Sequence, residues 1–423
     1  MHKQRLLRLP AAFLGTLALL LAVLLAVNAI PRAALARGLT ASADYYAAYG
    51  VRRNWAPGLE QSKEDIYADA VLMNIAACMK PGLAATAAAR YHDSGGYMGQ
   101  SLADAVGGAD ANADYSRYWH GALIPVTLLL LVTDAGGVRL INALLLAALA
   151  SLFLSACRKR RLKGLAAAYL LAFAATESFF VPLSIEYMPC YVLSLLAALL
   201  ILRLKEENLP LLFLLTGLCT AFFDFLTVET MTLLLPLIAL VALRRKRDET
   251  AGLVRSMAGY GGLWLAGYAG AFLCKWLLAA AVLGPSAWAE TAAMGAEKFA
   301  GDAPANLPLG RYGSAIFNNL AGLVPTTLAD TYLGVTAVLA AAGLILFCFW
   351  FLYRGRKLPR GIAPALILAG LVPYGRYLLL PYHALVHNFF TYRAQLCSLM
   401  CLFLLIGWTL DPARLRPKRR RKA

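Results

Sequence analysis

Two acidic side chains in one polar segment are spaced so that they could act together. The segment KEDIYAD, residues 63–69, contains Glu64, Asp65 and Asp69. It opens what its pattern predicts to be an amphipathic helix running to Met79. Residues four apart share a helix face, so Asp65 and Asp69 could deprotonate a hydroxyl or bind a divalent cation. The alternative is ordinary helix capping, with Ser62 as the N-cap and the acids in the first turn.

Arginine and histidine gather in a second segment, RYLLLPYHALVHNFFTYR, which runs from Arg376 to Arg393. His383 and His387 are also four residues apart, but a zinc site needs a third ligand and none is adjacent. Arginine offers paired donors to a phosphate and histidine an adjustable one, so the segment predicts a phosphate site. The alternative is an interfacial belt of aromatic rings and snorkelling basic side chains.

The string DYSRYWHG, residues 114–121, places Arg117 and His120 among aromatic residues. Aromatic rings beside charged groups suit stacking on a sugar and hydrogen bonding to its hydroxyls. The same composition suits an anchor at the membrane surface. Both interpretations stay open from the sequence.

Three further acids, Glu186, Asp224 and Glu229, lie at the edges of apolar stretches. Charged side chains at membrane depth are costly, which makes each a functional candidate. The segment FFVPLSIEYM, 179–188, aligns with FFDFLTVETM, 222–231, and indicates a duplicated helical hairpin. Both copies fall at outer hairpin tips, so these acids and the Arg/His segment predict a polar cavity that opens to the outside.

The composition shows what kind of fold must position these residues. Of 423 residues, 60% are hydrophobic and only 15% are charged, whereas soluble domains are nearer 45–50% apolar and about 25% charged. A soluble globular protein, a disordered protein and a disulfide scaffold are therefore excluded. The chain is predicted to be an all-α, polytopic integral membrane protein.

The apolar stretches predict about ten transmembrane helices. They fall near residues 9–30, 138–157, 164–183, 187–203, 209–225, 228–243, 256–276, 332–353, 361–380 and 391–410. Residues 122–132 are too short to cross a bilayer, since a crossing needs about 20 residues, and predict a helix lying on the outer surface.

Four regions follow from these spans. Residues 1–30 form the first transmembrane helix, and 31–135 a long first extracytoplasmic loop with the surface-lying helix. Residues 136–410 form the transmembrane bundle, with an outer loop at 284–330, and 411–423 a basic cytoplasmic tail. Span 1 also resembles a signal peptide with a possible cleavage site at 34–36, but a retained helix is favoured.

The charge distribution orients the chain. Forty Lys and Arg against 23 Asp and Glu give a net charge of +17. Clusters such as 158–161 and 244–247 lie between apolar stretches, and the orientation rule for membrane helices places them, with both termini, in the cytoplasm. The basic residues are therefore predicted to contact the lipid bilayer and not nucleic acid.

Motifs of several common activities are missing from the sequence. There is no P-loop, no GxSxG and no HExxH, so nucleotide-driven chemistry and the common serine and zinc hydrolases are not predicted. No CxxC pair occurs among the eight cysteines. No cofactor is predicted, no metal site is assigned, and a divalent cation at the carboxylates stays open.

In layout the chain resembles the GT-C superfamily, polytopic glycosyltransferases that use polyprenyl-phosphate-linked sugars. The resemblance is carried by the first span, the long outer loop with KEDIYAD, the surface-lying helix and the following helical hairpins. The strings YSRYWHG and HNFFTYR are similar to those of uncharacterised multi-pass membrane proteins of Gram-positive bacteria. These likenesses imply that the protein lies in the plasma membrane of a bacterium.

The resemblance also implies roles and substrates. The catalytic base would be an acid of the first outer loop: Glu64, Asp65 or Asp69. The lipid-linked phosphate would be held by basic residues of the outer face: Arg376, His383, His387 and Arg393. Further substrate-binding candidates are Arg117, His120, Glu186, Asp224 and Glu229. A polyprenyl-phosphate sugar would be the donor, and an envelope polymer or lipid the acceptor.

Two other functions stay open beside glycosyl transfer. A multi-pass transporter or lipid flippase is supported by the repeat and by the acids at hairpin tips, although transporters usually bind substrate near the midplane. A non-catalytic envelope assembly protein would use the same outer charges for orientation and partner contact.

Overall fold

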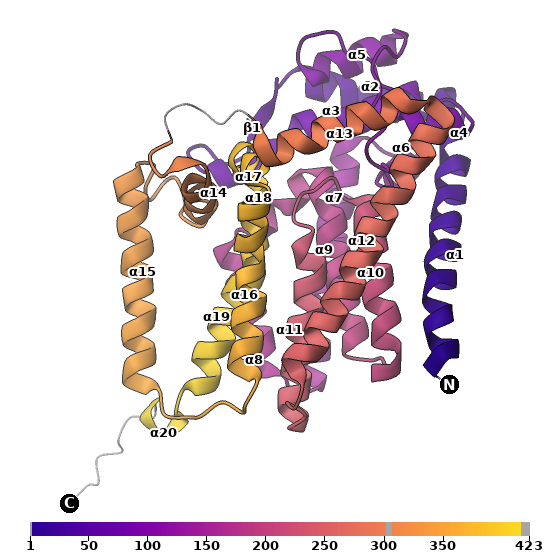
Figure 1. Ribbon diagram of the computed structural model, residues 1–423. Helices are drawn as coiled ribbons and strands as arrows, with labels where there is room; N and C mark the ends of the chain where they lie inside the picture. The colour runs from indigo at the N-terminus through magenta and orange to yellow at the C-terminus, as the bar shows by residue number, and fades with distance from the viewer. Residues whose placement is uncertain (1, 302–306, 416–423) are drawn as a thin grey trace, which may run out of the picture.

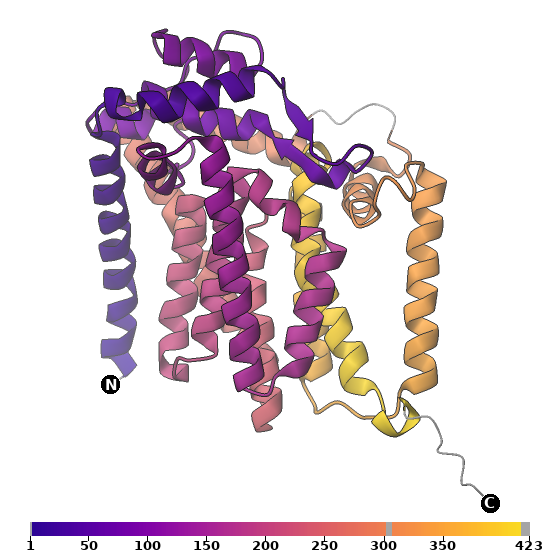
Figure 2. The same ribbon diagram turned by 180° about the vertical axis from the view of Figure 1, so that it is seen from behind.

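The computed structural model describes residues 2–301 and 307–415. Within that part the chain is almost entirely helical, and one short antiparallel hairpin is its only sheet. Figures 1 and 2 show long helices standing side by side, with other helices lying across one end. Following the predicted orientation, that end is called the outer end. The last part of the predicted basic tail, 416–423, lies outside the described residues.

A helix stands at each of the ten predicted spans. These upright helices are α1 (His2–Asn28), α7 (Ala135–Lys159), α8 (Lys163–Ala175), α9 (Met188–Ile201), α10 (Leu209–Phe223), α11 (Thr230–Arg247), α12 (Leu253–Leu283), α15 (Tyr332–Tyr353), α16 (Ile362–Leu379) and α19 (Gln395–Thr409). Seven of the described segments, those of α1, α7, α10, α12, α15, α16 and α19, are long and apolar enough to cross a membrane. The predicted class, an all-α polytopic membrane protein, is confirmed at that level.

The remaining three upright helices differ from those seven in length or charge. Helices α8 and α9 have 13 and 14 residues, fewer than a full crossing needs. Helix α11 has 18 residues and ends in the basic turn RRKR. By length and composition, seven helices of the described chain are candidate spans, and the count of ten stays a prediction.

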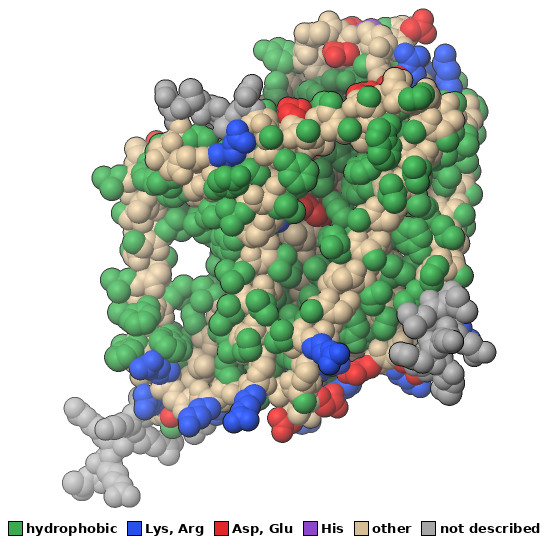
Figure 3. All heavy atoms as spheres, viewed as in Figure 1, with side chains coloured by type: hydrophobic (Ala, Val, Ile, Leu, Met, Phe, Trp, Pro, Cys, Tyr) green, Lys and Arg blue, Asp and Glu red, His purple; other side chains and the backbone are tan. Residues whose placement is uncertain are grey.

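The outward faces of the upright helices are apolar. Figure 3 shows hydrophobic side chains covering the flank, with Lys and Arg gathered at the inner end. Leu144 of α7 is 63% exposed and Leu333 of α15 is 78% exposed. Soluble monomers rarely leave such continuous apolar surface in water, so these faces fit the lipid bilayer.

Helix α15 stands apart from the bundle (Figure 1). Val335 is its one buried residue among those described. At the outer end the Tyr332 ring stacks on Phe317, with centroids 4.3 Å apart. At the inner end the Trp350 indole donates to Thr409 Oγ1 at 3.0 Å. The helix is thus attached at its two ends, and its middle faces lipid.

The outer end is built mainly from the predicted first loop. Its elements are α2 (Arg32–Ala47), β1 (Arg52–Asn54), β2 (Lys63–Asp65), α3 (Ile66–Cys78), α4 (Leu83–Ala88), α5 (Met98–Gly107) and α6 (Leu123–Leu130). Helices α13 (Pro285–Ala300) and α14 (Gly310–Ala321) come from the predicted outer loop 284–330. Figure 1 shows α13 lying across the tops of the upright helices. Helix α6 lies within the predicted surface helix 122–132.

Helix α3 differs from its prediction in two ways. Its N-cap is Asp65 and not Ser62, because the Asp65 carboxylate accepts from the Ala68 amide at 3.3 Å. The Ser62 hydroxyl instead donates to the Leu59 carbonyl in the preceding turn, at 2.7 Å. The helix is also buried on nearly all sides and is not amphipathic, because α2, α5 and α6 pack around it.

Close packing of α10 against α12 makes a rigid support under the outer layer. A Cβ on Gly217 would lie 2.0 Å from the Trp264 carbonyl oxygen, and one on Gly267 would lie 2.0 Å from that of Leu214. Glycine at both contacts lets the two backbones approach, as small residues do in membrane helix pairs. Trp119, from the loop above, donates its indole N–H to the Ala271 carbonyl at 2.8 Å and so fixes that loop on α12.

Candidate functional site

The main polar cavity lies at the outer end, between the first loop and the C-terminal helices. It has a volume of about 280 Å³. We call it the outer cavity and define it by its lining: Val51, Arg52, Asp65, Tyr67, Ala68, Val71, Leu72, Tyr115, Arg117, Tyr118, His120, Glu186, Phe225, Lys298, His383, Val386, His387, Phe389 and Phe390. Six predicted site residues are among them: Asp65, Arg117, His120, Glu186, His383 and His387.

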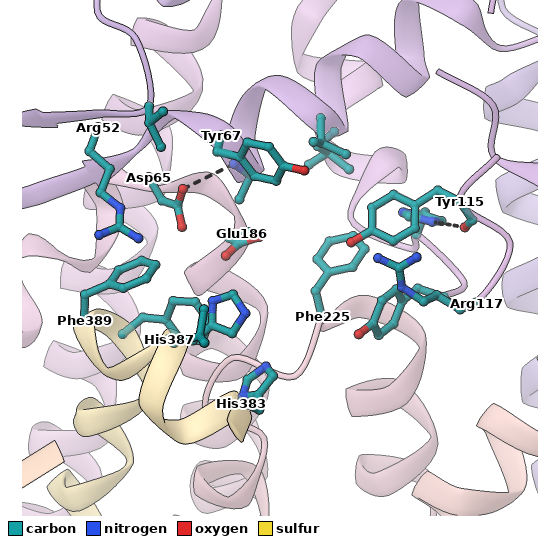
Figure 4. Close-up of a pocket in the computed structure, with 18 of the residues that line it drawn as sticks. Arg52, Asp65, Tyr67, Tyr115, Arg117, Glu186, Phe225, His383, His387 and Phe389 are labelled. Carbon is teal, nitrogen blue, oxygen red and sulfur yellow. Dashed lines mark hydrogen bonds between the residues drawn. The ribbon is translucent and has the colours of Figure 1, made fainter. Parts of the chain in front are cut away.

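Six parts of the chain supply these side chains: residues 51–72, 115–120, Glu186, Phe225, Lys298 and 383–390. Figure 4 shows Arg52, Asp65 and Tyr67 along one wall, with Phe389 and His387 facing them and Arg117 at the far side. Asp65 stands where β2 ends and α3 begins. Glu186 belongs to the short turn η3 (Ile185–Tyr187) between α8 and α9. Because α17 (Pro381–Val386) and α18 (Asn388–Thr391) bend the chain between α16 and α19, both histidines reach the cavity.

Two carboxyl groups line the cavity. Asp65 accepts hydrogen bonds from the Ala68 amide and, at 3.2 Å, from the Tyr187 hydroxyl. Glu186 is buried as well, with only 8% of the residue exposed. Burial raises the pKa of Asp65 and raises that of Glu186 much further, where the nearby charge of Asp65 adds to the effect. Glu186 is therefore the more readily protonated of the two.

Three cations surround these carboxyl groups. The Arg117 guanidinium carbon lies 4.1 Å from the centroid of the Tyr115 ring, and its buried Nε has no partner among the described residues. Lys298 reaches the cavity from α13. Burial lowers the Lys298 pKa, and the charge of Arg117 lowers it further. Arg52 stacks on Phe389 at 3.6 Å. The cavity therefore offers donors to an anion that could enter it.

The histidines of the cavity are neutral. Burial lowers the pKa of His387 to about 3, and the charges of Lys298 and Arg376 contribute. Burial also lowers the pKa of His383 well below its usual value. Their ring centroids lie 4.5 Å apart, and His383 Nδ1 has no partner among the described residues. Neutral imidazoles can donate or accept one hydrogen bond at each ring nitrogen, so they suit hydroxyls as well as phosphate oxygens.

His120 is held by the protein itself. Its Nε2 lies 2.8 Å from the Tyr115 carbonyl oxygen, while its Nδ1 has no partner among the described residues. Burial lowers its pKa to about 3. The rings of Tyr115, Tyr118 and Phe225 pack around it. The described residues contain no group of three or more His, Cys, Asp or Glu side chains that could hold a metal ion.

Glu64 and Asp69, the other two candidate bases, lie outside the cavity lining. The Glu64 carboxylate forms a buried ion pair with Arg139 of α7 and accepts from the Tyr45 hydroxyl at 2.6 Å. Asp69 Oδ1 accepts from the Ile185 amide at 2.8 Å, at the start of the turn that carries Glu186. Burial raises the Asp69 pKa well above its usual value. Both acids hold neighbouring elements in place around Asp65.

The predicted arginine clamp is also outside the lining. Arg376 pairs with Glu229 at 2.7 Å and donates to the Leu226 carbonyl at 3.0 Å. Arg393 donates to the Gln61 carbonyl at 2.9 Å, which joins the turn before α19 to the first outer loop. Asp224 accepts from the Thr227 amide at 3.0 Å in its own turn. Each of these four charged residues has a partner in the protein. Arg376 Nη1, Arg393 Nε and Glu229 Oε2 are nevertheless buried without a hydrogen-bond partner among the described residues.

Sequence reasoning missed Arg52 and Lys298, the two other cations of the outer cavity. Arg52 lies in a three-residue strand, and Lys298 in a helix of the outer loop 284–330. The segment AEKFA around Lys298 has a charged residue beside an aromatic one but no distinctive spacing. Tyr67, inside KEDIYAD, and Tyr115, inside DYSRYWHG, could have been found because each adjoins a predicted candidate.

No protein-family model, no characterised protein and no solved structure matches this chain.

Proposed function

We propose that this protein is a membrane glycosyltransferase that moves a sugar from a polyprenyl-phosphate carrier to an envelope acceptor. The supporting observation is the outer cavity, where one carboxylate, Asp65, lies among cationic, imidazole and aromatic side chains. A glycosyl transfer of this kind needs a base for the acceptor hydroxyl and cations for the leaving phosphate. Both kinds of group line one cavity.

Asp65 is the base in this proposal. A raised pKa brings a carboxylate closer to the pH at which proton transfer is efficient. The Asp65 carboxylate is held by the Ala68 amide and the Tyr187 hydroxyl, so its position is fixed before substrate arrives. Glu186, whose pKa is raised much further, keeps its proton and donates a hydrogen bond to a substrate oxygen.

Arg117 and Lys298 hold the phosphate. They replace Arg376 and Arg393 in that role, since those two lie outside the cavity lining and bind Glu229 and the Gln61 carbonyl. Arg117 brings a buried donor without a partner among the described residues, and Lys298 brings a compact charge. The Tyr67, Tyr115 and Phe225 rings can stack on a sugar face.

The proposal includes ten membrane crossings, both termini in the cytoplasm and the plasma membrane of a bacterium. Helices α8, α9 and α11 would then cross together with the seven longer ones. The grouping of Lys and Arg at the end opposite the cavity supports this orientation (Figure 3). The cavity would face the outside, where lipid-linked sugars meet envelope acceptors.

Transport is less well supported than transfer. Below the outer cavity the upright helices enclose a continuous apolar core that includes Phe153, Phe213 and Leu234. A flippase or transporter needs a polar path near the midplane, and the polar groups described above lie at the outer end. An assembly protein would not need an acid with a raised pKa inside a cavity.

Native mass spectrometry of the purified protein with undecaprenyl phosphate tests the phosphate site. We expect the parent to bind this lipid selectively over a neutral phospholipid, and the Arg117→Gln/Lys298→Gln variant to lose that selectivity. The control, Arg37→Gln/Lys80→Gln, removes equal charge from exposed residues of the outer layer and should bind as the parent does. Equal binding by all three proteins would refute the phosphate site and, with it, the transferase.

Transfer itself needs a second measurement. Membranes from a strain that lacks the gene are supplied with the parent or with the Asp65→Asn variant, and sugar incorporation into envelope material is compared. Loss of incorporation with Asp65→Asn, at unchanged protein level and unchanged undecaprenyl phosphate binding, is the expected result. Binding without any transfer by the parent would favour a carrier or assembly role.

A further inference from the structure

A second charged pocket lies at the inner end of the bundle, far from the outer cavity along the upright helices. It is formed where the α7–α8 turn meets the ends of α11 and α19. We call it the inner basic pocket and define it by its lining: Arg161, Leu162, Lys163, Gly164, Leu165, Ala242, Arg245, Lys246 and Trp408. Its volume is about 110 Å³.

Four of the nine lining residues are cationic and none is acidic. Basic residues on inner loops usually serve orientation, and they are then solvated and spread over the surface. Here they converge on one small pocket. Their mutual repulsion is unfavourable unless an anion enters, so the pocket favours a negatively charged ligand.

Arg161, Lys163 and Lys246 are exposed, whereas Arg245 is half-buried and packs on the aromatic wall of the pocket. The Arg245 guanidinium carbon lies 4.4 Å from the centroid of the Trp408 ring. Its Nε is buried and has no hydrogen-bond partner in the described part of the chain. A buried donor without a partner is costly, since its hydration is lost and not replaced. An acceptor oxygen in the pocket would remove that cost.

The start of α8 adds further donors. No side chain caps this helix, and its first residues, Lys163, Gly164 and Leu165, line the pocket. Free amides and the helix dipole at an N-terminus favour an anion. Arg161, just before the helix, has a φ of 54°, a conformation that few residues other than glycine adopt. This turn brings both the helix start and Arg245 to one point.

Gly164 sets the size of the pocket. A Cβ at this position would lie 2.9 Å from Trp408 Nε1, so only glycine leaves the indole in its present place. Trp408 lies one residue before the end of α19, at the level where tryptophan meets lipid headgroups. The pocket is therefore at headgroup depth, beside the inner leaflet.

We propose that the inner basic pocket binds the phosphate of an anionic phospholipid from the inner leaflet. Basic pockets between membrane helices on the cytoplasmic side are suited to such headgroups. Arg245 and Lys163 supply the charges, the amides at the start of α8 supply backbone donors, and Trp408 packs against the glycerol region. Lys246 donates to the Arg160 carbonyl at 2.5 Å and so closes one side of the pocket. This inference does not depend on the function of the outer cavity.

The test uses the full chain and phosphatidylglycerol, with phosphatidylcholine as the neutral comparison, in native mass spectrometry. We expect the parent to retain one phosphatidylglycerol in preference to phosphatidylcholine. The Lys163→Gln/Arg245→Gln variant should bind about 30-fold more weakly, since each basic residue near an anionic lipid contributes about a factor of five. The control, Lys357→Gln/Arg360→Gln, removes the same charge from another inner loop and should change binding less than twofold.

The Gly164→Leu variant distinguishes binding in the pocket from attraction to the overall basic charge of the inner end. It keeps every basic residue but fills the pocket against Trp408, so phosphatidylglycerol selectivity should be lost. Gel filtration and thermal unfolding show whether each variant is folded before binding is compared. If this variant is folded and binds as the parent does, the proposal is overturned. The same holds if the control loses as much binding as the pocket variant.

The lipid and a free anion are distinguished by competition. Inorganic phosphate in excess should leave phosphatidylglycerol bound, because the lipid is also held by its chains in the bilayer or micelle. Displacement of the lipid by inorganic phosphate at millimolar concentration would overturn the lipid assignment and identify a soluble anion site.

Discussion

Arg52 lies opposite Asp65 in the β1–β2 pair, and its guanidinium carbon stacks 3.6 Å from the centroid of the Phe389 ring. One strand pair therefore joins the acid of the first loop to the aromatic and histidine residues near the C-terminus. The charge of Arg52 acts on the Asp65 carboxyl and lowers its pKa, against the larger effect of burial. Arg52 thus lowers the pKa of Asp65 and also forms part of the cavity wall.

Asp65→Asn should abolish transfer, by a factor of about 10² to 10⁴, because a positioned base contributes rate increases of that size. Asparagine can still accept from the Ala68 amide, so the N-cap and the fold should survive. Sugar incorporation in isolated membranes measures the loss. The matched control is Asp69→Asn, which keeps an acceptor for the Ile185 amide and should leave most of the activity. Equal loss in both variants would argue against Asp65 as the base.

The acid side of the pH profile should follow Asp65. Its pKa is raised by burial, and the base must be deprotonated, so kcat/KM falls as the pH drops through that raised value. Arg52→Gln removes a charge that lowers the pKa, so the fall should move to higher pH. Arg52→Lys keeps the charge and should leave the profile near that of the parent. An unchanged pH profile in the Arg52→Gln variant would contradict Asp65 as the titrating base.

The alkaline side should follow Lys298. Burial and the charge of Arg117 lower its pKa, so Lys298 loses its proton below the usual lysine range. Phosphate binding should then weaken as the pH rises through this lowered value. Lys298→Arg keeps a cation at every accessible pH and should extend activity upward. If the loss of activity at high pH is unchanged in this variant, Lys298 does not bind the phosphate.

Breaking the Glu64–Arg139 pair should destabilise the outer layer strongly. The Glu64 side chain is fully buried and that of Arg139 is 9% exposed, so either partner alone leaves a buried charge. Arg139→Gln should cost about 3–5 kcal/mol of unfolding free energy. Arg90→Gln breaks the exposed pair with Asp114 and should cost about 0–1 kcal/mol. Unfolding of the purified proteins in one detergent allows the comparison.

Gly267→Ala should separate α10 from α12. The new Cβ would meet the Leu214 carbonyl at 2.0 Å, and overpacking of this kind costs about 1–3 kcal/mol. Gly259 lies on the same helix and has no atom within 4 Å of an added Cβ. Gly259→Ala should therefore be neutral, or stabilising by up to about 1 kcal/mol. The unfolding midpoints of the two variants should move in different directions.

The membrane fold could be predicted because apolar length is a local property of the chain. Each predicted span contains an upright helix, and the short helix α6 falls within residues 122–132. The first loop could not be predicted at the same level. Its helix α2 and the β1–β2 hairpin form by packing against distant segments, and the sequence has no strong local signal for either.

The site was predicted in part for the same reason. Asp65, His383 and His387 were identified from residue type and spacing, which are visible in the sequence. Lys298 enters the outer cavity only because α13 folds back across the upright helices, and Arg52 only because its strand pairs with β2. Arg376 was a reasonable candidate by type, but its partner Glu229 is 147 residues away in the chain.

The two attachments of α15 have a consequence for handling the protein. With Tyr332 fixed at one end and Trp350 at the other, the helix and the bundle enclose gaps that the space-filling view leaves open (Figure 3). In a bilayer, hydrocarbon chains would fill those gaps, and lipid held there would support the position of α15. Harsh delipidation would then collapse α15 onto its neighbours, and a preparation that keeps annular lipid would preserve the native spacing.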